Sequence, residues 1–419
     1  MAKSDKNSLS YEEALVKVLA YGEPLEAEEV HFMDALGRVL AEDALSDIDV
    51  SPFDNSAMDG FAIIAKDLEK ASADYPVSLE VKELIPAGGV PQITVETGSC
   101  ARIMTGAAMP EGADTVIKIE QTSAFSGGGN VGETIEISAP IELGANVRYA
   151  GEEVKAGEVV LPKGEVVDVA AIGLLAATGN TTVKVHRRPV VGIVSTGSEL
   201  VEPHEKPGKG QIRNSNSYAN ASQAVDSGAR TIIYPIVEDS YEATVEAFKQ
   251  ASEECDIIVT SGGVSVGDFD FVKPALESLG TLEFAKVNMR PGNPQTMGRI
   301  GNAFFFGLPG NPSSCYVGFE AFLRPLILKM LGHKDLKRPV VHARLEKGMS
   351  KRQARKYFLR GNVSKDAQGN WVARLPYSQS SALLTAAHYG NAFVILPEGE
   401  AKIEAGQDVE CWLLRIDEI

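Results

Sequence analysis

Hydrophobic residues between positions 189 and 308 form short continuous runs that are separated by amphipathic stretches. The runs PVVGIVST (189–196), DIIVT (256–260) and AFFFGL (303–308) are typical of strands buried on both faces of a sheet. The intervening patterns predict helices, which we place near 214–227, 240–254, 271–279 and 312–331. This alternation predicts a central doubly wound, mostly parallel α/β domain over 183–335. Ligands of such sheets bind beyond the carboxyl ends of the strands.

The flanking segments have a different pattern. Residues 77–146 and the residues after 336 contain short alternating runs between Gly and Pro clusters, which predicts two β-rich modules. Residues 8–45 have a helical pattern throughout, and a strand pair followed by a helix is expected over 153–180. We therefore predict a multidomain α/β protein with β modules. Its parts are a mixed helical linking domain (1–50 and 147–182), an inserted β domain (51–146), the α/β domain (183–335) and a C-terminal β domain (336–419).

Composition excludes several classes of protein. The chain has 419 residues, 44% of them hydrophobic and 23% charged, which is ordinary for a globular protein. With 40 Lys and Arg against 57 Asp and Glu, its net charge of −17 argues against nucleic acid as a partner. We find neither a signal-peptide pattern nor an apolar run of about 18 residues, so we expect a cytoplasmic protein without a membrane partner. Four scattered cysteines favour neither a disulfide framework nor a zinc site.

Positive charge is concentrated in one segment, which we call the basic island. Residues 336–375 hold eleven Lys and Arg against two acidic residues, a local charge of +9. The residues before position 336 hold 27 basic and 48 acidic residues, a net charge of −21. A cluster of this kind is often only a solvated face. Several of its cations flank the short aromatic strand at Tyr357 and Phe358, which places them on an ordered element.

Carboxylates follow three of the predicted strands. Glu199 lies in STGSEL, Asp239 in VEDS, and Asp268 and Asp270 follow the glycine-rich GGVSVG segment. Carboxylates from three strand ends could converge on Mg²⁺, which prefers oxygen ligands and bridges to phosphates. The alternative, that each acid only caps a helix, stays open.

Glycines and prolines mark the loops at the same edge of the sheet. Gly262, Gly263 and Ser265 belong to a turn whose backbone N–H groups could approach an anion. GGVSVG is neither a Walker A loop nor a dinucleotide-binding fingerprint. The turns at Pro309 and Pro312 predict a rigid loop, and Lys286 and Arg290 add cations beside it.

Together, these motifs closely resemble the molybdopterin molybdenumtransferase family, to which the C-terminal part of gephyrin is related. The matching segments occur in family order from end to end of the chain. They are FDNSAMDGFA (53–62), RIMTGAAMPEGAD (102–114), GEE (151–153), STGSEL (195–200), TSGGVSVGD (260–268), RPGNP (290–294) and GLPGNP (307–312).

The resemblance implies a reaction in which molybdate is inserted into adenylated molybdopterin and AMP is released with the help of Mg²⁺. It also implies an elongated homodimer with composite active sites, and transient contact with the pterin-adenylating enzyme and with recipient molybdoenzymes. The metal ligands it implies are Glu199, Asp239 and Asp270. The other catalytic residues it implies are Asp59, Thr105, Glu153 and Lys286. The substrate-binding residues it implies are Arg290, Asn293, Pro294, Pro309, Pro312, Arg360, Ser381, Gly262, Gly263 and Ser265.

The chain departs from the family pattern at four positions. Glu153 stands where Asp is usual, and Ser198 where Asp is common. Arg290 and Asn293 replace the two lysines of a KPGKP motif. Arg290 keeps the first charge, and the loss of the second means either weaker oxyanion binding or compensation by a neighbouring cation, for which we expect residues 347–360 of the basic island. Two other functions stay open: a non-catalytic scaffold or binding protein on the same fold, and a paralogue that handles tungstate.

Overall fold

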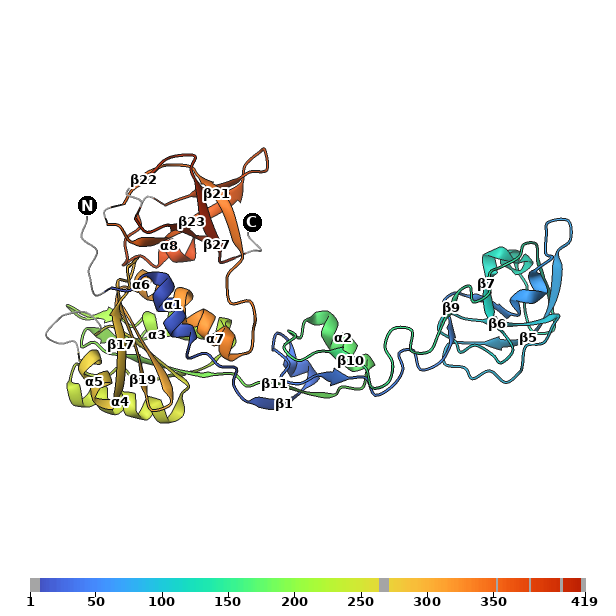
Figure 1. Cartoon of the computed structure of the whole chain (residues 1–419), viewed down its shortest axis with the longest axis horizontal. Coiled ribbons are helices and arrows are strands. Elements are labelled where there is room, and N and C mark those ends of the chain that lie inside the picture. Colours follow the sequence, from blue (N-terminus) through green and yellow to red (C-terminus); the bar gives the residue numbers. More distant parts are fainter. Residues whose placement is uncertain (1–7, 264–270, 352, 377, 400–401, 416–419) are drawn as a thin grey trace. The chain divides into compact units, whose positions relative to one another are not determined.

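The computed structural model describes residues 8–263, 271–351, 353–376, 378–399 and 402–415. The chain divides into two compact units (Figure 1). Unit 1 combines Met1–Glu28 with Val185–Ile419, and unit 2 is Glu29–Lys184. Among the described residues, no helix is long and apolar enough to cross a membrane.

The N-terminal segment begins with the expected helix, α1 (Tyr11–Leu19), which starts at a capping box made by Ser10 and Glu13. The helical pattern expected for 27–42 is wrong. Ala27–His31 is a strand, β1, and Phe32–Ala35 is a single 3₁₀ turn. Residues of β1 alternate between exposed and half-buried, and the strand pairs with β11 (Thr182–His186). Tertiary pairing thus overrides the helical preference of the Glu-rich sequence.

Unit 2 holds the expected β-rich insertion. Its five-stranded sheet has the order β7-β4-β6-β5-β8 and packs around Phe61, Leu79 and Ile135. Two short antiparallel pairs, β3–β9 and β2–β10, accompany it, and helix α2 lies near the 3₁₀ turn. The bounds are β2 Ala44–Leu45, β3 Asn55–Ser56, β4 Gly60–Ile63, β5 Val77–Ile85, β6 Ser99–Ile103, β7 Thr115–Lys118, β8 Thr134–Ile137, β9 Val147–Arg148, β10 Val159–Leu161 and α2 Val169–Ala177. Short 3₁₀ turns cover Ala65–Leu68, Ile119–Gln121 and Ser123–Ser126.

The predicted α/β domain is confirmed in unit 1. Its sheet has the order β15-β12-β16-β20-β19-β17, in which the first four strands are parallel, β19 is antiparallel to both of its neighbours, and β17 runs in the direction of the first four. The strands are β12 Val190–Ser195, β15 Arg230–Ile233, β16 Ile257–Ser261, β17 Gly280–Lys286, β19 Pro294–Ile300 and β20 Ala303–Leu308. The sheet is therefore mostly parallel, and an antiparallel hairpin at one edge completes it.

Helices cover both faces of this sheet, as Figure 1 shows. Phe304 and Phe306 face α1, α3 (Asn216–Asp226) and the helix of residues 312–330, whereas Phe305 faces α4 (Tyr241–Glu254) and α5 (Val272–Leu279). The apolar helix expected over 312–331 consists of α6 (Pro312–Gly318), a π-helical segment (Phe319–Leu323) and α7 (Arg324–Met330).

The C-terminal β module is a sheet that closes on itself, because β23 pairs with both β24 and β25. The aromatic side chains of Tyr11, Phe322, Phe358 and Trp412 pack together and join it to the α/β domain. Its elements are β18 Met289–Arg290, β21 Val340–Leu345, β22 Met349–Ser350, β23 Lys356–Lys365, β24 Trp371–Arg374, α8 Thr385–His388, β25 Ala392–Leu396, β26 Lys402–Ile403 and β27 Asp408–Leu413.

Candidate functional site

A cavity of about 300 Å³ lies at the carboxyl ends of the parallel strands, and we call it the strand-end pocket. The loops after β12, β16 and β20 form much of it, as the sheet topology predicts. Three of the expected site residues, Glu199, Gly262 and Pro312, line this pocket together. The other lining residues are Thr196, Leu200, Ile212, Arg213, Asn214, Ser215, Asn216, Ser261, Gly310, Asn311 and Ala382.

Two glycines shape the loop after β16. Gly262 and Gly263 have φ values of +94° and +61°. A Cβ atom at Gly263 would lie 2.7 Å from Cγ2 of Val272, and one at Gly262 would lie 3.1 Å from the carbonyl oxygen of Thr196. Both positions therefore need glycine, for space and for the left-handed backbone. The predicted Ser265 and Asp270, like Asp268, lie outside the described residues.

A buried group of hydroxyls and one amide supports the floor of the pocket. The Ser195 hydroxyl lies 2.6 Å from the Ser217 hydroxyl and 3.2 Å from that of Ser261. Asn214 joins the group by donating from Nδ2 to the Ser217 hydroxyl over 3.0 Å. Since all four side chains are buried and bonded to one another, they fix the ends of β12 and β16 against the start of α3.

Polar side chains of α3 contact the turn after β20 and helix α6, which follows it. Asn216 donates from Nδ2 to the carbonyl oxygen of Gly310 over 2.8 Å, and Gln223 donates from Nε2 to that of Tyr316 over 3.1 Å. Between them, Asn220 donates from Nδ2 to the Cys315 sulfur over 3.2 Å. The three amides lie on one face of the helix because they are four and three residues apart.

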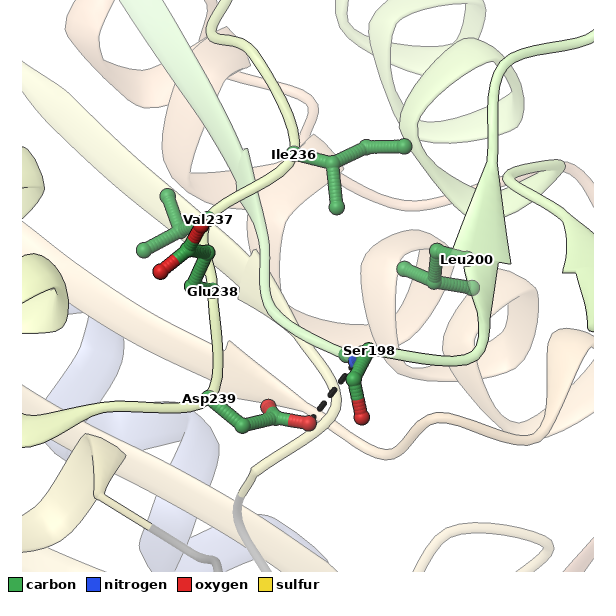
Figure 2. Close-up of a pocket in the computed structure, with 7 residues that line it drawn as sticks. Ser198, Leu200, Ile236, Val237, Glu238 and Asp239 are labelled. Atoms are coloured by element: carbon green, nitrogen blue, oxygen red, sulfur yellow. Dashed lines mark hydrogen bonds between the residues drawn. The ribbon is translucent and has the colours of Figure 1, made fainter.

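Asp239 lies at a second cavity of about 640 Å³ on the other side of the 197–200 turn. Figure 2 shows its carboxylate pointing to Ser198, whose backbone N–H donates to Oδ2 over 2.7 Å. Glu199 and Asp239 therefore flank one turn but line different cavities. Among the residues described, no three acidic, His or Cys side chains form a metal site. The third predicted ligand, Asp270, is outside those residues, so the predicted ligand set stays a prediction.

A third cavity, of about 400 Å³, lies between the α/β domain and the C-terminal β module, and we call it the cationic pocket. Five of the expected substrate-binding residues line it, namely Arg290, Asn293, Pro294, Pro309 and Ser381. Its other lining residues are Met289, Pro291, Gly292, Asn311, Ser314, Gln353, Arg355, Gln379 and Ser380. Asn311 lines this pocket and the strand-end pocket, so the two cavities are neighbours.

Arg360 lies behind the cationic pocket and is 1% exposed. Its backbone N–H donates to Gln379 over 3.1 Å, and its Nη2 donates to the carbonyl oxygen of Ser380 over 3.0 Å. Its Nε has no hydrogen-bond partner among the described residues. Burial, and to a lesser extent the charge of Arg290, lowers the pKa of Arg360 to about 10. A buried guanidinium with an unused donor and a second cation nearby favours a bound anion.

Asn293 and Lys286 occupy supporting positions. The Asn293 amide donates from Nδ2 to the carbonyl oxygen of Val287 over 2.6 Å, which closes the loop that carries Arg290. Lys286 ends β17 opposite Pro294 and is not among the lining residues of the cationic pocket.

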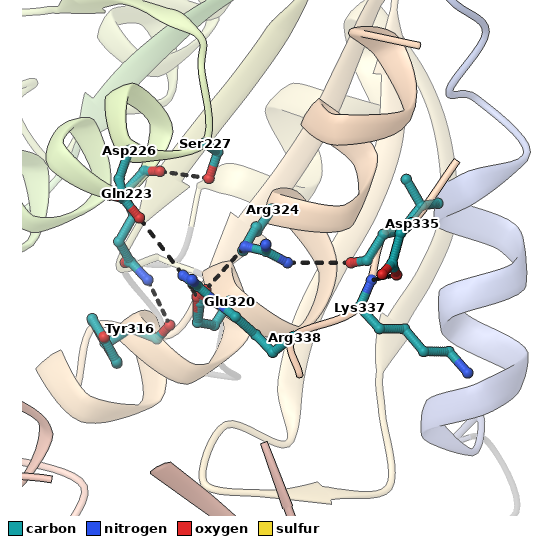
Figure 3. Close-up of polar contacts among 10 residues, drawn as sticks. Gln223, Asp226, Ser227, Tyr316, Glu320, Arg324, Asp335, Lys337 and Arg338 are labelled. Atoms are coloured by element: carbon teal, nitrogen blue, oxygen red, sulfur yellow. Dashed lines mark hydrogen bonds and ion pairs between the residues drawn. The ribbon is translucent and has the colours of Figure 1, made fainter. Parts of the chain in front are cut away.

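The basic island is divided between structural and pocket positions. Arg338 forms a bidentate ion pair with the buried Glu320 (Figure 3). Arg355, in contrast, lines the cationic pocket. The expected compensation for Asn293 therefore has a specific candidate in Arg355.

Unit 2 carries the other three expected catalytic residues. Oδ1 of Asp59 accepts hydrogen bonds from the backbone N–H and from the hydroxyl of Thr105, each 2.7 Å long, and these bonds lower the pKa of Asp59. The two residues are thus in direct contact. Glu153 lines a separate cavity of about 510 Å³ with Asn55 and Tyr149 among its neighbours. The catalytic roles of all three stay predictions.

Sequence reasoning missed the uncharged polar residues, Asn214, Ser217, Asn216 and Gln379. The NSNSY segment that opens α3 contains three of them, but in a sequence these residue types are equally typical of a helix start. Only their contacts across the sheet distinguish the two roles.

Three family descriptions match successive parts of the chain. They are the MoeA N-terminal region (domain I and II) at residues 9–179, a probable molybdopterin binding domain at 192–329, and the MoeA C-terminal region (domain IV) at 342–414.

Curated relatives and solved structures agree with these matches. A molybdopterin molybdenumtransferase of Bacillus subtilis is 38% identical over 98% of this chain and 95% of its own length. One of Staphylococcus aureus is 34% identical over 100% of this chain and 98% of its own. The crystal structure of a molybdopterin biosynthesis moea protein from Pyrococcus horikosii superimposes with a TM-score of 0.82 at 32% identity. The superposition covers 97% of this chain and 99% of the Pyrococcus chain.

Proposed function

This chain belongs to the molybdopterin molybdenumtransferase family, and on that premise we propose that it inserts molybdenum from molybdate into adenylated molybdopterin and releases AMP. It is a transferase of molybdenum cofactor biosynthesis. The release of AMP, the help of Mg²⁺ and the roles of single residues are the parts that we propose.

The observation that carries the proposal is the pairing of two pockets through Asn311. Molybdate is a small dianion, and Arg290 and Arg355 line the cationic pocket. The buried Arg360 donates to Ser380 of its lining, and among the described residues its Nε has no hydrogen-bond partner. Guanidinium groups suit oxyanions because their N–H groups form a planar fork. We therefore assign molybdate to the cationic pocket.

We assign the pyrophosphate and AMP parts of the substrate to the strand-end pocket. Glycine-rich turns after parallel strands expose backbone N–H groups, and such groups bind phosphates. The loop at Gly262 and the turn at Gly310 are of this type, and α3 begins at the same pocket. Because the pockets adjoin at Asn311, a substrate bound this way would present its pterin end to the oxyanion.

The residues at the 197–200 turn fit a divalent cation. Glu199 lies in this turn and Asp239 accepts from its Ser198 N–H, so two carboxylates flank the turn, and Mg²⁺ in nucleotide sites is held by one or two carboxylates and by the phosphates. Mg²⁺ bound there would neutralise charge on the pyrophosphate and on the departing phosphate of AMP. The chain itself binds the adenylate, orients it through the turn, and holds the oxyanion on its guanidinium groups.

We also propose a homodimer located in the cytoplasm. Every residue of α2 is apolar, yet only Ala171 and Leu175 are buried, and Val169 is 80% exposed. An apolar helix that is not buried in its own chain marks an interaction surface, and a second copy is the partner that the family resemblance favours. Four free cysteines suit a reducing compartment.

The experiment is an AMP-release assay with the purified full chain and adenylated molybdopterin. We expect AMP release only when both molybdate and Mg²⁺ are present, and Asp239→Asn should slow it without unfolding the protein. A chain that binds the adenylate but shows no molybdate-dependent release would contradict the proposal. Replacing molybdate by tungstate in the same assay tests the tungstate-handling alternative, which faster release with tungstate would favour.

A further inference from the structure

Arg290 is held in the cationic pocket by a neutral partner. It ends β18, which pairs in parallel with β23 so that Arg290 lies opposite Tyr357. Its Nη1 donates to the Tyr357 hydroxyl oxygen over 3.2 Å, and its guanidinium carbon lies 5.3 Å from the centre of the Tyr357 ring. In the part of the chain that the structure describes, no carboxylate forms an ion pair with Arg290.

Tyr357 is built into the protein as a rigid support. It is 2% exposed and belongs to the core of the C-terminal β module. Its hydroxyl oxygen also accepts from the backbone N–H of Gln353 over 3.4 Å, and the ammonium group of Lys351 lies 5.1 Å from its ring centre. One hydroxyl thus contacts two residues that line the cationic pocket, Arg290 and Gln353.

The neutrality of this support has a physical consequence. A carboxylate would also fix the guanidinium, but it would cancel the positive charge that an oxyanion needs. A hydroxyl and an aromatic face fix the same group by a hydrogen bond and by the ring quadrupole, and they leave its charge in place. Arginine has five N–H donors, so a single bond to Tyr357 leaves the others for a ligand.

We propose that Tyr357 is a positioning residue for molybdate binding, which orients the Arg290 guanidinium in the cationic pocket through the bond from Nη1 to the phenol oxygen. This inference rests on the proposed function, because it takes molybdate as the ligand of that pocket. Tyr357 itself is not among the lining residues of the pocket, so it acts through Arg290.

The test combines Tyr357→Phe, Arg290→Ala and the double variant of the full chain. Tyr357→Phe keeps the ring and removes the hydroxyl. We expect about a tenfold higher half-saturating molybdate concentration in the AMP-release assay, the usual cost of one hydrogen bond to a charged group. The half-saturating concentration of adenylated molybdopterin should stay unchanged. In the Arg290→Ala background, Tyr357→Phe should have no further effect.

Tyr234→Phe is the matched control. Tyr234 is also buried, and the substitution removes a hydrogen bond from its hydroxyl to Glu254. Tyr234 is not among the lining residues of the three cavities of unit 1 described above. It should leave the molybdate dependence unchanged. Calorimetric titration with sodium molybdate gives a second readout that needs no turnover. If the wild type is active and Tyr357→Phe has the same molybdate dependence, the role of Tyr357 is overturned but the proposed function is not. An equal loss of molybdate affinity on Tyr357→Phe in the wild-type and Arg290→Ala backgrounds would also overturn it, since the hydroxyl would then act independently of Arg290. A wild type that neither binds molybdate nor releases AMP would overturn the proposed function as well.

Discussion

At the scale of single residues, the buried Arg360 offers a sharp test of the proposed molybdate site, although it is not among the lining residues of the cationic pocket. Its guanidinium is buried and donates from Nη2 to a backbone carbonyl, and its Nε has no partner in the part of the chain that the structure describes. Burying a charge with an open donor is costly unless a ligand completes it. The residue is therefore better explained by anion binding than by the stability of the β module alone.

Replacement of Arg360 by Lys tests this explanation. Lysine keeps one positive charge but lacks Nε and the planar fork, so we expect the half-saturating molybdate concentration to rise by about tenfold. Molybdate titration of AMP release measures the change. Arg374→Lys, on the same sheet but paired with the exposed Glu346, is the control and should behave as wild type. If both variants have the same half-saturating molybdate concentration, Arg360 does not bind molybdate.

At the scale of elements, the strands of the α/β domain are fixed at both ends. The carboxyl ends carry the pockets, and the opposite ends of β12 and β16 are joined by an ion pair. Arg187 donates to both carboxylate oxygens of Asp256 over 2.7 Å, and the Val190 N–H donates to the same carboxylate over 2.8 Å. Burial acts to raise the pKa of Asp256, but the bonds from Arg187 and Val190 outweigh it, and the pKa is lowered.

Asp256→Asn should therefore destabilise unit 1 by about 2 kcal/mol at pH 7, since charged hydrogen bonds are lost in a partly buried setting. A lowered folded pKa stabilises the fold above the unfolded pKa of about 4, and this stabilisation is lost as pH falls through the folded value. The difference between variant and wild type should accordingly shrink below about pH 4. Urea unfolding monitored by tryptophan fluorescence measures this difference in the free energy of unfolding, because both tryptophans, Trp371 and Trp412, lie in unit 1.

Glu404→Gln serves as the control for that experiment, because its pair with Lys402 is exposed on both sides and should contribute little. A difference between Asp256→Asn and wild type that is independent of pH would contradict the role of the carboxylate charge.

Elements also show where pattern reasoning fails. The helices over 214–227, 240–254 and 271–279 are confirmed within two residues, because each has a long apolar face and packs on the sheet. Residues 27–42 have apolar positions at helical spacing too, but pairing with β11 makes Ala27–His31 a strand. Periodicity therefore predicts elements that bury a face and fails where a distant strand supplies the partner.

At the scale of the whole molecule, the exposed apolar surface around α2 of unit 2 is the feature that a single chain leaves unexplained. Met33 and Leu36, at the adjacent 3₁₀ turn, are 56% and 51% exposed, and Val166 and Val169 add to the same region. A second copy covering these residues would remove them from water.

Val169→Lys should shift the protein from dimer towards monomer, since it places a charge in the proposed interface. Sedimentation velocity at several protein concentrations measures the shift. Val131→Lys, at an exposed position elsewhere in unit 2, is the matched control and should leave the dimer intact. A wild type that sediments as a monomer would contradict the dimer, and a dimeric Val169→Lys would place its interface elsewhere.

The sequence by itself determined the α/β domain, the β modules on either side of it and the family, because continuous apolar runs and long specific motifs are local properties of a chain. It also placed Arg290, Pro309 and Ser381 in one binding function, and the structure brings them to one cavity. Only the tertiary structure decided that Arg355 lines that cavity while Arg338 pairs with Glu320, and that Arg290 donates a hydrogen bond to Tyr357. The physical reason is that charge and aromatic character are written in the sequence, whereas a partner 67 residues away is chosen by strand register and packing.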